Sequence, residues 1–251
     1  MIKGLFTAAA SMVATQRNLD VVTNNLANVG TTGFKRKEGV RSAFPELMMS
    51  YLEGGNPVRE IGSLGTGVYL EETYTDFSSG NYRYTGNDLD FALEGDAFFR
   101  VMLPEETILY TKNGNFTLNE VGQLVTEQGY PVMGVRDQPL TIIPGEEIKI
   151  DGQGQIHSGL EGSEQIAVTG FDNPNSLLKQ GGNLYTIGGA VEEEVEEFCL
   201  KQFYLEDANV NIVEEMVKII EKNRLYEANQ KTITGIDENL GQAVNEIARL
   251  R

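Results

Sequence analysis

Apolar residues recur every seven positions at both ends of the chain, and this repeat restricts the fold more than any other feature. Near the N-terminus the repeat runs through Leu5, Met12, Leu19 and Leu26. Near the C-terminus it runs through Ile212, Ile219, Tyr226, Ile233, Leu240 and Ile247. Seven-residue spacing places side chains on one face of a helix. We therefore predict amphipathic helices over residues 3–29 and 211–250.

A second row of residues accompanies each repeat. At the N-terminal end the row contains Met1, Ala8, Val22 and Val29. At the C-terminal end it mixes Met216 and Val244 with the polar Asn223, Gln230 and Asp237, which is typical of a narrow coiled-coil seam. As a helix the C-terminal end would measure about 60 Å and the N-terminal end about 37 Å. About 20 Å of the longer, C-terminal seam would therefore lack a partner. That surplus favours contacts between subunits.

The N-terminal sequence imitates a secretory signal peptide, because Lys3 precedes the apolar run LFTAAASMVA. A signal peptide would end at the small residues, whereas here the seven-residue repeat continues to Leu26. The sequence therefore predicts a retained helix and no cleavage. Since no apolar run reaches about 18 residues, a membrane-spanning helix is not expected.

The middle of the chain alternates short β-type runs with turn dipeptides. The candidate strands are residues 97–103, 108–111, 115–118, 123–126, 148–150, 165–171 and 198–205. Asn113-Gly114, Val121-Gly122 and Asp151-Gly152 stand where tight hairpins would need them, and the first and last are type I′ signals. We predict an antiparallel β domain.

The predicted fold class is α+β, with N- and C-terminal amphipathic helices forming a coiled-coil-like helical domain and a central, mainly antiparallel β domain. Residues 1–35 with 208–251 would form the helical assembly domain and 76–207 the β-rich domain. Residues 36–75 are interpreted as an extended connector, in which 44–52 has some helical character and 53–67 is rich in glycine. The acidic run at 192–197 is expected to be a solvated loop or hairpin edge.

Composition excludes several classes of function. The net charge of −17 argues against nucleic-acid binding, which requires clustered Lys and Arg. The single cysteine, Cys199, forms no intramolecular disulfide and is expected to be a buried packing residue. We expect no cofactor.

The sequence offers little for catalysis. His157 is the single histidine, and no serine stands in a nucleophile elbow. No zinc or calcium motif is present, so no metal site is expected. Paired carboxylates of a hydrolase remain open, and the absence of tryptophan disfavours a glycan-binding module.

Residues 24–36, NNLANVGTTGFKR, combine a helix end with three asparagines. Amides beside an apolar seam lower stability but specify register, so we interpret Asn24, Asn25 and Asn28 as register marks for assembly. Gly30 would be a left-handed C-cap and Gly33 a second bend. Phe34 would anchor the exit, and residues 35–36 would return to polar surface. Contacts between different surfaces of identical subunits, which such register marks would specify, build helical filaments or tubes.

The same stretch resembles the N-terminal motif of flagellar axial proteins, the rod and hook family. The pattern ANxxTxGFK is met by Ala27, Asn28, Thr31, Gly33, Phe34 and Lys35. The C-terminal motif of that family is matched at Asn209, Val210, Asn211, Glu215, Met216, Arg224, Tyr226, Glu227, Asn229, Lys231 and Leu240. Residues 88–103, 110–134 and 181–189 are similar to the basal-body rod proteins, so the resemblance covers nearly the whole chain.

The resemblance implies a non-enzymatic subunit whose terminal helices form an inner tube around an export channel. It implies partners among rod and hook subunits and the flagellar type III export apparatus, and a location in the flagellar basal body outside the cytoplasm. Length and the 110–134 block resemble rod proteins. Residues 209–216 and 122–132 resemble the distal rod type. The connector at 53–67 is shorter than the resemblance to that type implies. The proximal rod and hook types remain alternatives.

The predicted assembly interface combines the two helix stripes with residues of the two motifs. It comprises Leu5, Met12, Leu19, Asn24, Asn25, Leu26, Asn28, Gly33, Phe34, Asn209, Asn211, Ile212, Met216, Ile219, Arg224, Tyr226, Asn229, Ile233, Leu240 and Ile247.

Overall fold

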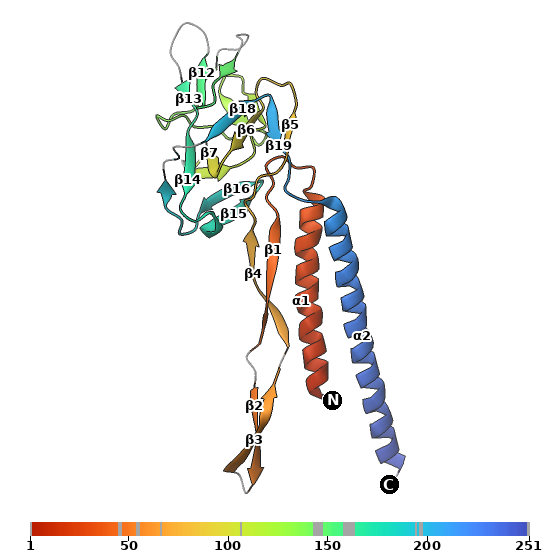
Figure 1. The fold of residues 1–251 in the computed structure, drawn as a ribbon. Coiled ribbons are helices and arrows are strands. Elements are labelled where there is room, and N and C mark those ends of the chain that lie inside the picture. The colour runs from red at the N-terminus through yellow and green to blue at the C-terminus, as the bar shows by residue number, and fades with distance from the viewer. Residues whose placement is uncertain are drawn as a thin grey trace. The chain divides into compact units, whose positions relative to one another are not determined.

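The computed structural model describes residues 2–44, 47–53, 56–65, 67–105, 107–142, 148–157, 164–193, 195 and 198–249, with the backbone alone at 2, 47–53, 56–64, 157 and 247–249. Two helices and mostly antiparallel strands confirm the α+β class (Figure 1). The chain divides into two compact units. The first comprises Met1–Leu26, Lys37–Tyr74 and Ile212–Arg251, and the second comprises Ala27–Arg36 and Thr75–Asn211.

The first unit contains both helices. Helix α1 spans Ile2–Ala27 and helix α2 spans Ile212–Arg249, so both predicted helices are confirmed to within about two residues. Glu214 and Glu215 occupy the first turn of α2, where a negative charge complements the helix dipole. Neither helix, over its described residues, is long and apolar enough to cross a membrane.

Residues 37–75 form a two-stranded ribbon in the first unit. Strand β1 (Lys37–Ala43) pairs with β4 (Val68–Thr75), and β2 (Leu47–Glu53) pairs antiparallel with β3 (Asn56–Leu64). The helical character expected at 44–52 is therefore wrong. The apolar run there was ambiguous between helix and strand, and antiparallel pairing with the partner strand β3 decided for the strand.

Helix α1 packs on this ribbon through small side chains. A Cβ on Gly39 would lie 2.8 Å from Nδ2 of Asn18, and a Cβ on Gly67 would lie 3.4 Å from that of Ala10. The most buried residues of α1 are Ala8, Ala14, Thr15, Asn18, Val22 and Asn25. The row of Leu5, Met12, Leu19 and Leu26 flanks this face and is half-buried. Close backbone approach thus selects small and amide side chains for the inner face.

The second unit contains the remaining strands. They are β5 (Tyr82–Tyr84), β6 (Phe91–Glu94), β7 (Ala97–Met102), β8 (Ile108–Thr111), β9 (Phe116–Leu118), β10 (Leu124–Thr126), β11 (Lys149–Ile150), β12 (Gln155–His157), β13 (Glu164–Gln165), β14 (Val168–Phe171), β15 (Leu177–Gly181), β16 (Leu184–Ile187), β17 (Glu192–Glu193), β18 (Cys199–Gln202) and β19 (Tyr204–Glu206). A 3₁₀ turn, η1, spans Pro174–Ser176. The predicted β-rich middle is confirmed.

The largest sheet has the order β15-β16-β8-β7-β14-β17, with antiparallel pairs. Its central strand β7 is buried on both faces. Phe99 and Val101 belong to one apolar cluster and Phe98 to a second cluster with Tyr110 and Tyr185. A strand covered on both sides is mostly apolar, which explains residues 97–99 and 101–102, whereas the half-buried Arg100 pairs with Asp137.

The three turn predictions have different outcomes. Val121-Gly122 joins the antiparallel strands β9 and β10, with φ of 83° at Gly122, as expected. Asp151-Gly152 connects the antiparallel strands β11 and β12, but the positive φ of 77° is at Gly154, so the type I′ turn is wrong. Asn113-Gly114 does not close a hairpin, because β8 pairs with β7 and β16 whereas β9 pairs with β10.

Two further expectations concern the surface of the second unit. Glu192 and Glu193 form the exposed edge strand β17, as predicted, and residues 194, 196 and 197 of the acidic run lie outside the described part. Cys199 is exposed, so its predicted burial is wrong. Side chains alternate across a strand, and Leu200 takes the inward position on β18.

The end of α1 differs from the expected cap. Gly30 does not have the positive φ of a left-handed C-cap, so that prediction is wrong. Gly33 has φ of 65°, which confirms the second bend. A Cβ on Gly33 would lie 2.5 Å from the backbone nitrogen of Asn113, closer than real contacts allow. Glycine is required at residue 33 by both conformation and space.

We predict that Gly33→Ala lowers the free energy of unfolding of the second unit by at least about 1–3 kcal/mol, the typical strain of a left-handed non-glycine residue. Urea unfolding followed by tyrosine fluorescence measures the change. Gly30→Ala is the matched control, because a Cβ there meets nothing within 4 Å. Equal effects of the two substitutions would contradict the assignment.

Candidate assembly site of the terminal helices

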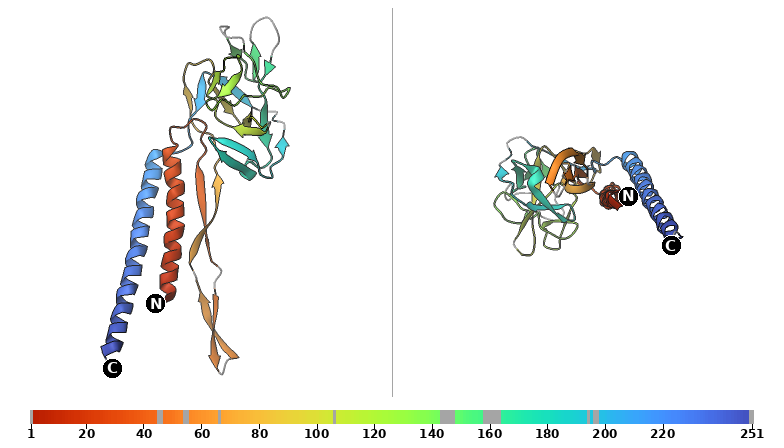
Figure 2. Two further views of the ribbon diagram at one scale, coloured as in Figure 1. Left: turned by 180° about the vertical axis from the view of Figure 1, so that it is seen from behind. Right: turned by 90° about the horizontal axis from the view of Figure 1, so that it is seen from below.

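Helices α1 and α2 lie side by side and antiparallel (Figures 1 and 2). Nδ2 of Asn25 donates to Glu215 Oε2 at 3.3 Å, and Nδ2 of Asn229 donates to Ser11 Oγ at 3.0 Å. Further along, Ile236 Cδ1 lies 3.4 Å from the position of a Cβ on Gly4. The residue numbers of each pair add to 240, so the register is constant along the helices.

This register leaves the end of α2 without a partner helix in the part of the chain that the structure describes. The α2 segment opposite α1 ends near Ile236, and the helix continues to Arg249. The overhang of residues 237–249 is about 20 Å long at 1.5 Å per residue. Figure 2 shows α2 passing beyond the N-terminal end of α1. The unpaired length expected from the sequence is therefore present.

Asn25 of α1 binds two other elements of the first unit, β1 and α2. Its Oδ1 accepts from the backbone N–H of Lys37 at 2.9 Å, and its Nδ2 donates to the Lys37 carbonyl at 2.8 Å. The same Nδ2 reaches Glu215, whose other oxygen accepts from Lys218 at 2.8 Å. The amide thus satisfies both backbone groups of the first β1 residue and also contacts α2, which a hydrophobic residue could not do.

The residues that follow α1 attach to the second unit. Thr32 donates its hydroxyl to Asn113 Oδ1 at 2.7 Å and accepts at its carbonyl from Asn183 at 3.0 Å. The Gly33 N–H donates to the Glu206 carbonyl at 2.8 Å. Phe34 is buried, and Lys179 Nζ lies 4.0 Å from its ring centroid, which confirms the predicted anchor.

Lys35 forms a buried ion pair with Glu206. The Nζ–Oε1 distance is 2.7 Å, and the two side chains are 1% and 2% exposed. Lys35 also donates to the Ser78 carbonyl at 2.9 Å, and Glu206 accepts from the Gly80 N–H at 2.7 Å. The expectation that Lys35 returns to polar surface is wrong, because a buried carboxylate 171 positions away provides its partner.

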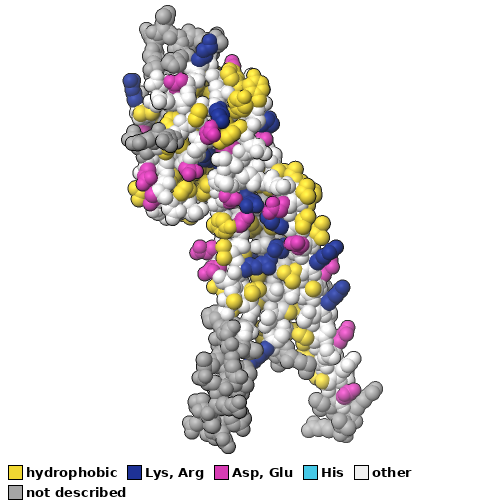
Figure 3. Space-filling model, in the orientation of Figure 1, with side chains coloured by type: hydrophobic (Ala, Val, Ile, Leu, Met, Phe, Trp, Pro, Cys, Tyr) yellow, Lys and Arg dark blue, Asp and Glu magenta, His cyan; other side chains and the backbone are white. Residues whose placement is uncertain are grey.

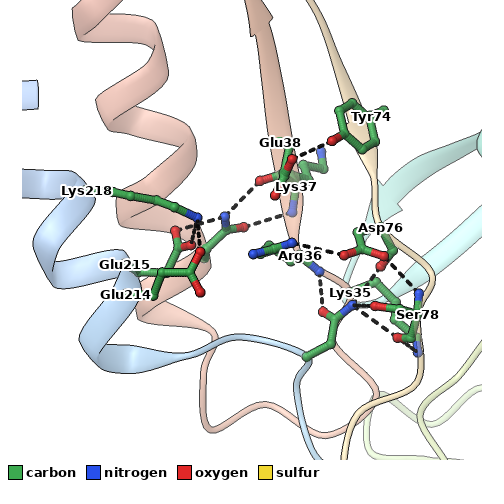
Figure 4. A network of polar contacts seen from close by, with 12 residues as sticks. Lys35, Arg36, Lys37, Glu38, Tyr74, Asp76, Ser78, Glu214, Glu215 and Lys218 are labelled. Carbon is green, nitrogen blue, oxygen red and sulfur yellow. Dashed lines mark hydrogen bonds and ion pairs between the residues drawn. The ribbon is translucent and has the colours of Figure 1, made fainter.

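Arg36 and Asn209 complete this attachment. The Arg36 N–H donates to Asn209 Oδ1 at 2.7 Å, and its guanidinium pairs with Asp76 at 3.1 Å. Asn209 Nδ2 donates to the carbonyls of Asp76 at 2.8 Å and Ser78 at 3.1 Å. Figure 4 shows Arg36 pointing at Asp76, and Lys218 pointing at Glu214 and Glu215. The N-terminal motif and Asn209 of the C-terminal motif therefore bind one another in the second unit.

The residues predicted for assembly fall into three groups. Asn25, Gly33, Phe34 and Asn209 make the internal contacts described above. Half-buried residues are Leu5, Met12, Leu19, Leu26, Asn28, Ile219, Tyr226, Asn229, Ile233 and Leu240. Exposed residues are Asn24, Asn211, Ile212, Met216 and Arg224. The side chain of Ile247 lies outside the described part. Asn28, Gly33, Phe34, Asn209 and Asn211 belong to the second unit and the others to the first.

Exposed apolar side chains follow a second face of each helix, which the seven-residue repeat did not identify. On α2 they are Val213 (70% exposed), Val217 and Ile220, which are spaced four and three residues apart. On α1 they are Phe6 (66%) and Val13. Figure 3 shows hydrophobic side chains at the surface of the helices. Large apolar side chains exposed in a row along a helix mark a surface for protein contacts.

The sequence did not predict the two buried carboxylates that bind the ends of the chain, one in each unit. Glu206 and Glu215 are nearly inaccessible, although acidic residues are rarely buried. Neither had a local sequence signal, because each partner is remote in the sequence. Glu215 stands in the C-terminal motif, and this is the feature that could have indicated its role.

Lys112 is a second buried lysine of the second unit. Its Nζ donates to the Gly95 carbonyl at 2.5 Å and lies 5.2 Å from the centroid of Phe98. Burial, and then the charge of Lys35, lower the pKa of Lys112 to about 8. Burial likewise raises the pKa of the Tyr185 hydroxyl, with a further contribution from Glu206. Among the described residues, no group of three or more His, Cys, Asp or Glu side chains is placed to hold a metal ion.

Three family models match this chain. "Flagella basal body rod protein" matches residues 5–35, "Flagellar hook protein FlgE/F/G D1 domain" matches 92–158, and "Flagellar basal body rod FlgEFG protein C-terminal" matches 201–246. The flagellar basal-body rod protein FlgG of Borreliella burgdorferi is 35% identical over 98% of both chains. The flagellar hook-basal body complex protein FlhO of Bacillus subtilis is 32% identical over 100% of both. FlgG of Caulobacter vibrioides is 34% identical over 98% of this chain and 99% of the relative.

The chain belongs to the flagellar basal-body rod family. The family is structural, so the chain is a structural subunit of the flagellar rod and hook family rather than an enzyme. Its place is the flagellar basal body, where it assembles with other axial proteins. The first and third family models coincide with the two terminal helices and the residues that attach them.

We predict that Asn25→Asp lowers the free energy of unfolding of the first unit by about 2–4 kcal/mol, because a buried carboxylate would face Glu215 and the Lys37 carbonyl. Urea unfolding followed by circular dichroism at 222 nm measures the loss. Asn24→Asp makes the same chemical change at an exposed neighbouring residue and is expected to cost less than about 0.5 kcal/mol.

We predict that the second unit becomes more stable as the pH rises from about 8 to about 10. The pKa of Lys112 is about 8 when folded and 10.5 when free, so the unfolded chain binds more protons in this window and stability rises with pH. The gain is at most about 3 kcal/mol. Above about pH 10 ionisation of unfolded tyrosines opposes it, since burial raises the pKa of Tyr185. Lys112→Met should remove the rise in urea midpoint, and a rise that persists would contradict the assignment.

Proposed function

We propose that this chain is a rod subunit that polymerises through its terminal helices into a hollow helical drive shaft. The observation that carries this proposal is the overhang of α2, a helical segment of about 20 Å that has no partner helix among the described residues of its own chain. Exposed Phe6 and Val13 on α1, and Val213 and Val217 on α2, add apolar surface that water would leave unfavourably solvated. Polymerisation would bury this surface.

We propose the distal rod as the place of assembly, with the proximal rod and the hook as alternatives. Residues 209–216 and 122–132 resemble the distal type, and several relatives named FlgG are about equally similar along the full length. FlhO, which is named a hook-basal body complex protein, has a comparable identity of 32%. Electron microscopy of purified basal bodies containing the tagged chain distinguishes the three positions, and label in the hook or proximal rod would overturn the distal assignment.

We also propose export through the flagellar type III apparatus without removal of the N-terminus, to a site outside the cytoplasm. Cleavage at the small residues Ala8–Ala10 would remove Gly4, which faces Ile236 across the helix pair, and would leave Ser11 at a frayed end. The N-terminal residues belong to a packed helix pair, unlike a disposable leader. Mass spectrometry of the assembled subunit tests the proposal, and a mature N-terminus beyond Ala10 would refute it.

We predict that Ile219→Asp abolishes polymerisation while the second unit stays folded, because the carboxylate would enter an apolar seam of the first unit. Polymer is measured by ultracentrifuge pelleting, and folding by tyrosine fluorescence. Ala228→Asp places the same charge on the exposed face of α2 and should polymerise normally. Wild-type amounts of polymer from Ile219→Asp would rule out this seam as an assembly element.

A further inference from the structure

The two helices of the first unit diverge and leave an apolar hollow between them. Figure 2, seen from below, shows α1 nearly end on and α2 inclined to it. The hollow has a volume of about 480 Å³ and is lined by Ala9, Met12, Val13, Gln16, Arg17, Tyr226 and Ile233. Its position is next to the overhang of α2 along the same pair of helices.

The overhang carries the chemistry that would fill such a hollow. Leu240 continues the seam of Tyr226 and Ile233 at seven-residue spacing, and Val244 follows one turn later on the same face. Val244 is 65% exposed, since α1 ends before it. The face that packs on α1 within the chain therefore continues into a segment where α1 of the same chain does not reach.

The hollow and the overhang also carry side chains of opposite charge. Arg17 lies on the rim of the hollow, and Asp237 lies one turn before Leu240 on the overhang. Neither side chain has an ion-pair partner in the described part of the chain. If a second overhang ran antiparallel to α1, as α2 does within the chain, Asp237 opposite Arg17 would bring Leu240 near Val13 and Val244 near Ala9.

We propose that the α2 overhang of one subunit, residues 237–249, inserts into the α1–α2 hollow of a second copy of this chain. The contact is heterologous, because the donor segment and the receiving hollow are different surfaces, and it repeats along a polymer. Leu240 and Val244 fill the hollow, and Asp237 pairs with Arg17 of the receiving copy. This inference rests on the proposed polymerisation and names the surfaces that carry it.

A disulfide between two copies tests the contact in the full-length chain. One chain carries Ala9→Cys and the other Val244→Cys, both with Cys199→Ser to remove the native thiol. Within one chain the constant register places Ala9 opposite Lys231, about 20 Å from residue 244, so an intrachain bridge is excluded. We expect mixed oxidation of these two chains to give at least tenfold more disulfide-linked heterodimer than a control mixture of Ala9→Cys with Val213→Cys, which lies on the opposite face of α2. Equal yields would overturn the proposal.

A charge exchange tests the ionic part. Asp237→Arg in the Val244→Cys chain should reduce the disulfide yield at least fivefold, and Arg17→Asp in the Ala9→Cys chain should restore it. Leu240→Asp should reduce it tenfold, whereas Gln242→Asp on the exposed face should not. Absence of rescue, or full yield with Leu240→Asp, would contradict the docking. Pelleted polymer without the disulfide would overturn this contact and leave the proposed function standing, whereas loss of both would overturn both.

Discussion

The buried ion pair between Lys35 and Glu206 fixes the chain segment that follows α1 inside the β-rich second unit, and the other contacts of that segment depend on it. Both side chains are almost inaccessible, and their atoms are 2.7 Å apart. Removal of one partner would leave the other charge buried and unpaired, which typically costs about 3–5 kcal/mol. The pair therefore holds the segment after α1 against the segment before α2. The Ser78 carbonyl also accepts from Lys35, and the Gly80 N–H also donates to Oε1 of Glu206.

Asparagine has the same use in each of the two units. Asn25 binds both backbone groups of Lys37 in the first unit, and Asn209 binds the N–H of Arg36 in the second. An amide offers a donor and an acceptor together, so it can replace a strand neighbour at the end of a ribbon. The chain thus passes from one unit to the other at residues 36 and 37, each of which is held inside its own unit. The motif asparagines first interpreted as register marks for assembly include at least one, Asn25, with a defined internal role.

The apolar seam of α2 is only partly covered by α1 of the same chain. Within one chain α1 covers α2 from Glu215 to Ile236 with a constant register, and beyond that the seam continues uncovered. Burial of apolar surface is favourable wherever a partner is present, so an uncovered seam is a driving force for association. In the polymer that we propose, identical subunits would supply that partner at every step. Membership of the rod family and the geometry of the helices lead to the same structural role.

The sequence by itself determined the helices, their lengths and the antiparallel β middle, because seven-residue and two-residue periodicities are local properties of the chain. It also indicated the family, through motifs spaced along the whole chain. Only the tertiary structure decided that Lys35 is buried, that residues 47–53 pair as a strand and that Asn113-Gly114 closes no hairpin. Those outcomes depend on partners far away in sequence, such as Glu206 for Lys35 and β3 for β2, and no local pattern encodes which remote group will complete a charge or a backbone hydrogen bond.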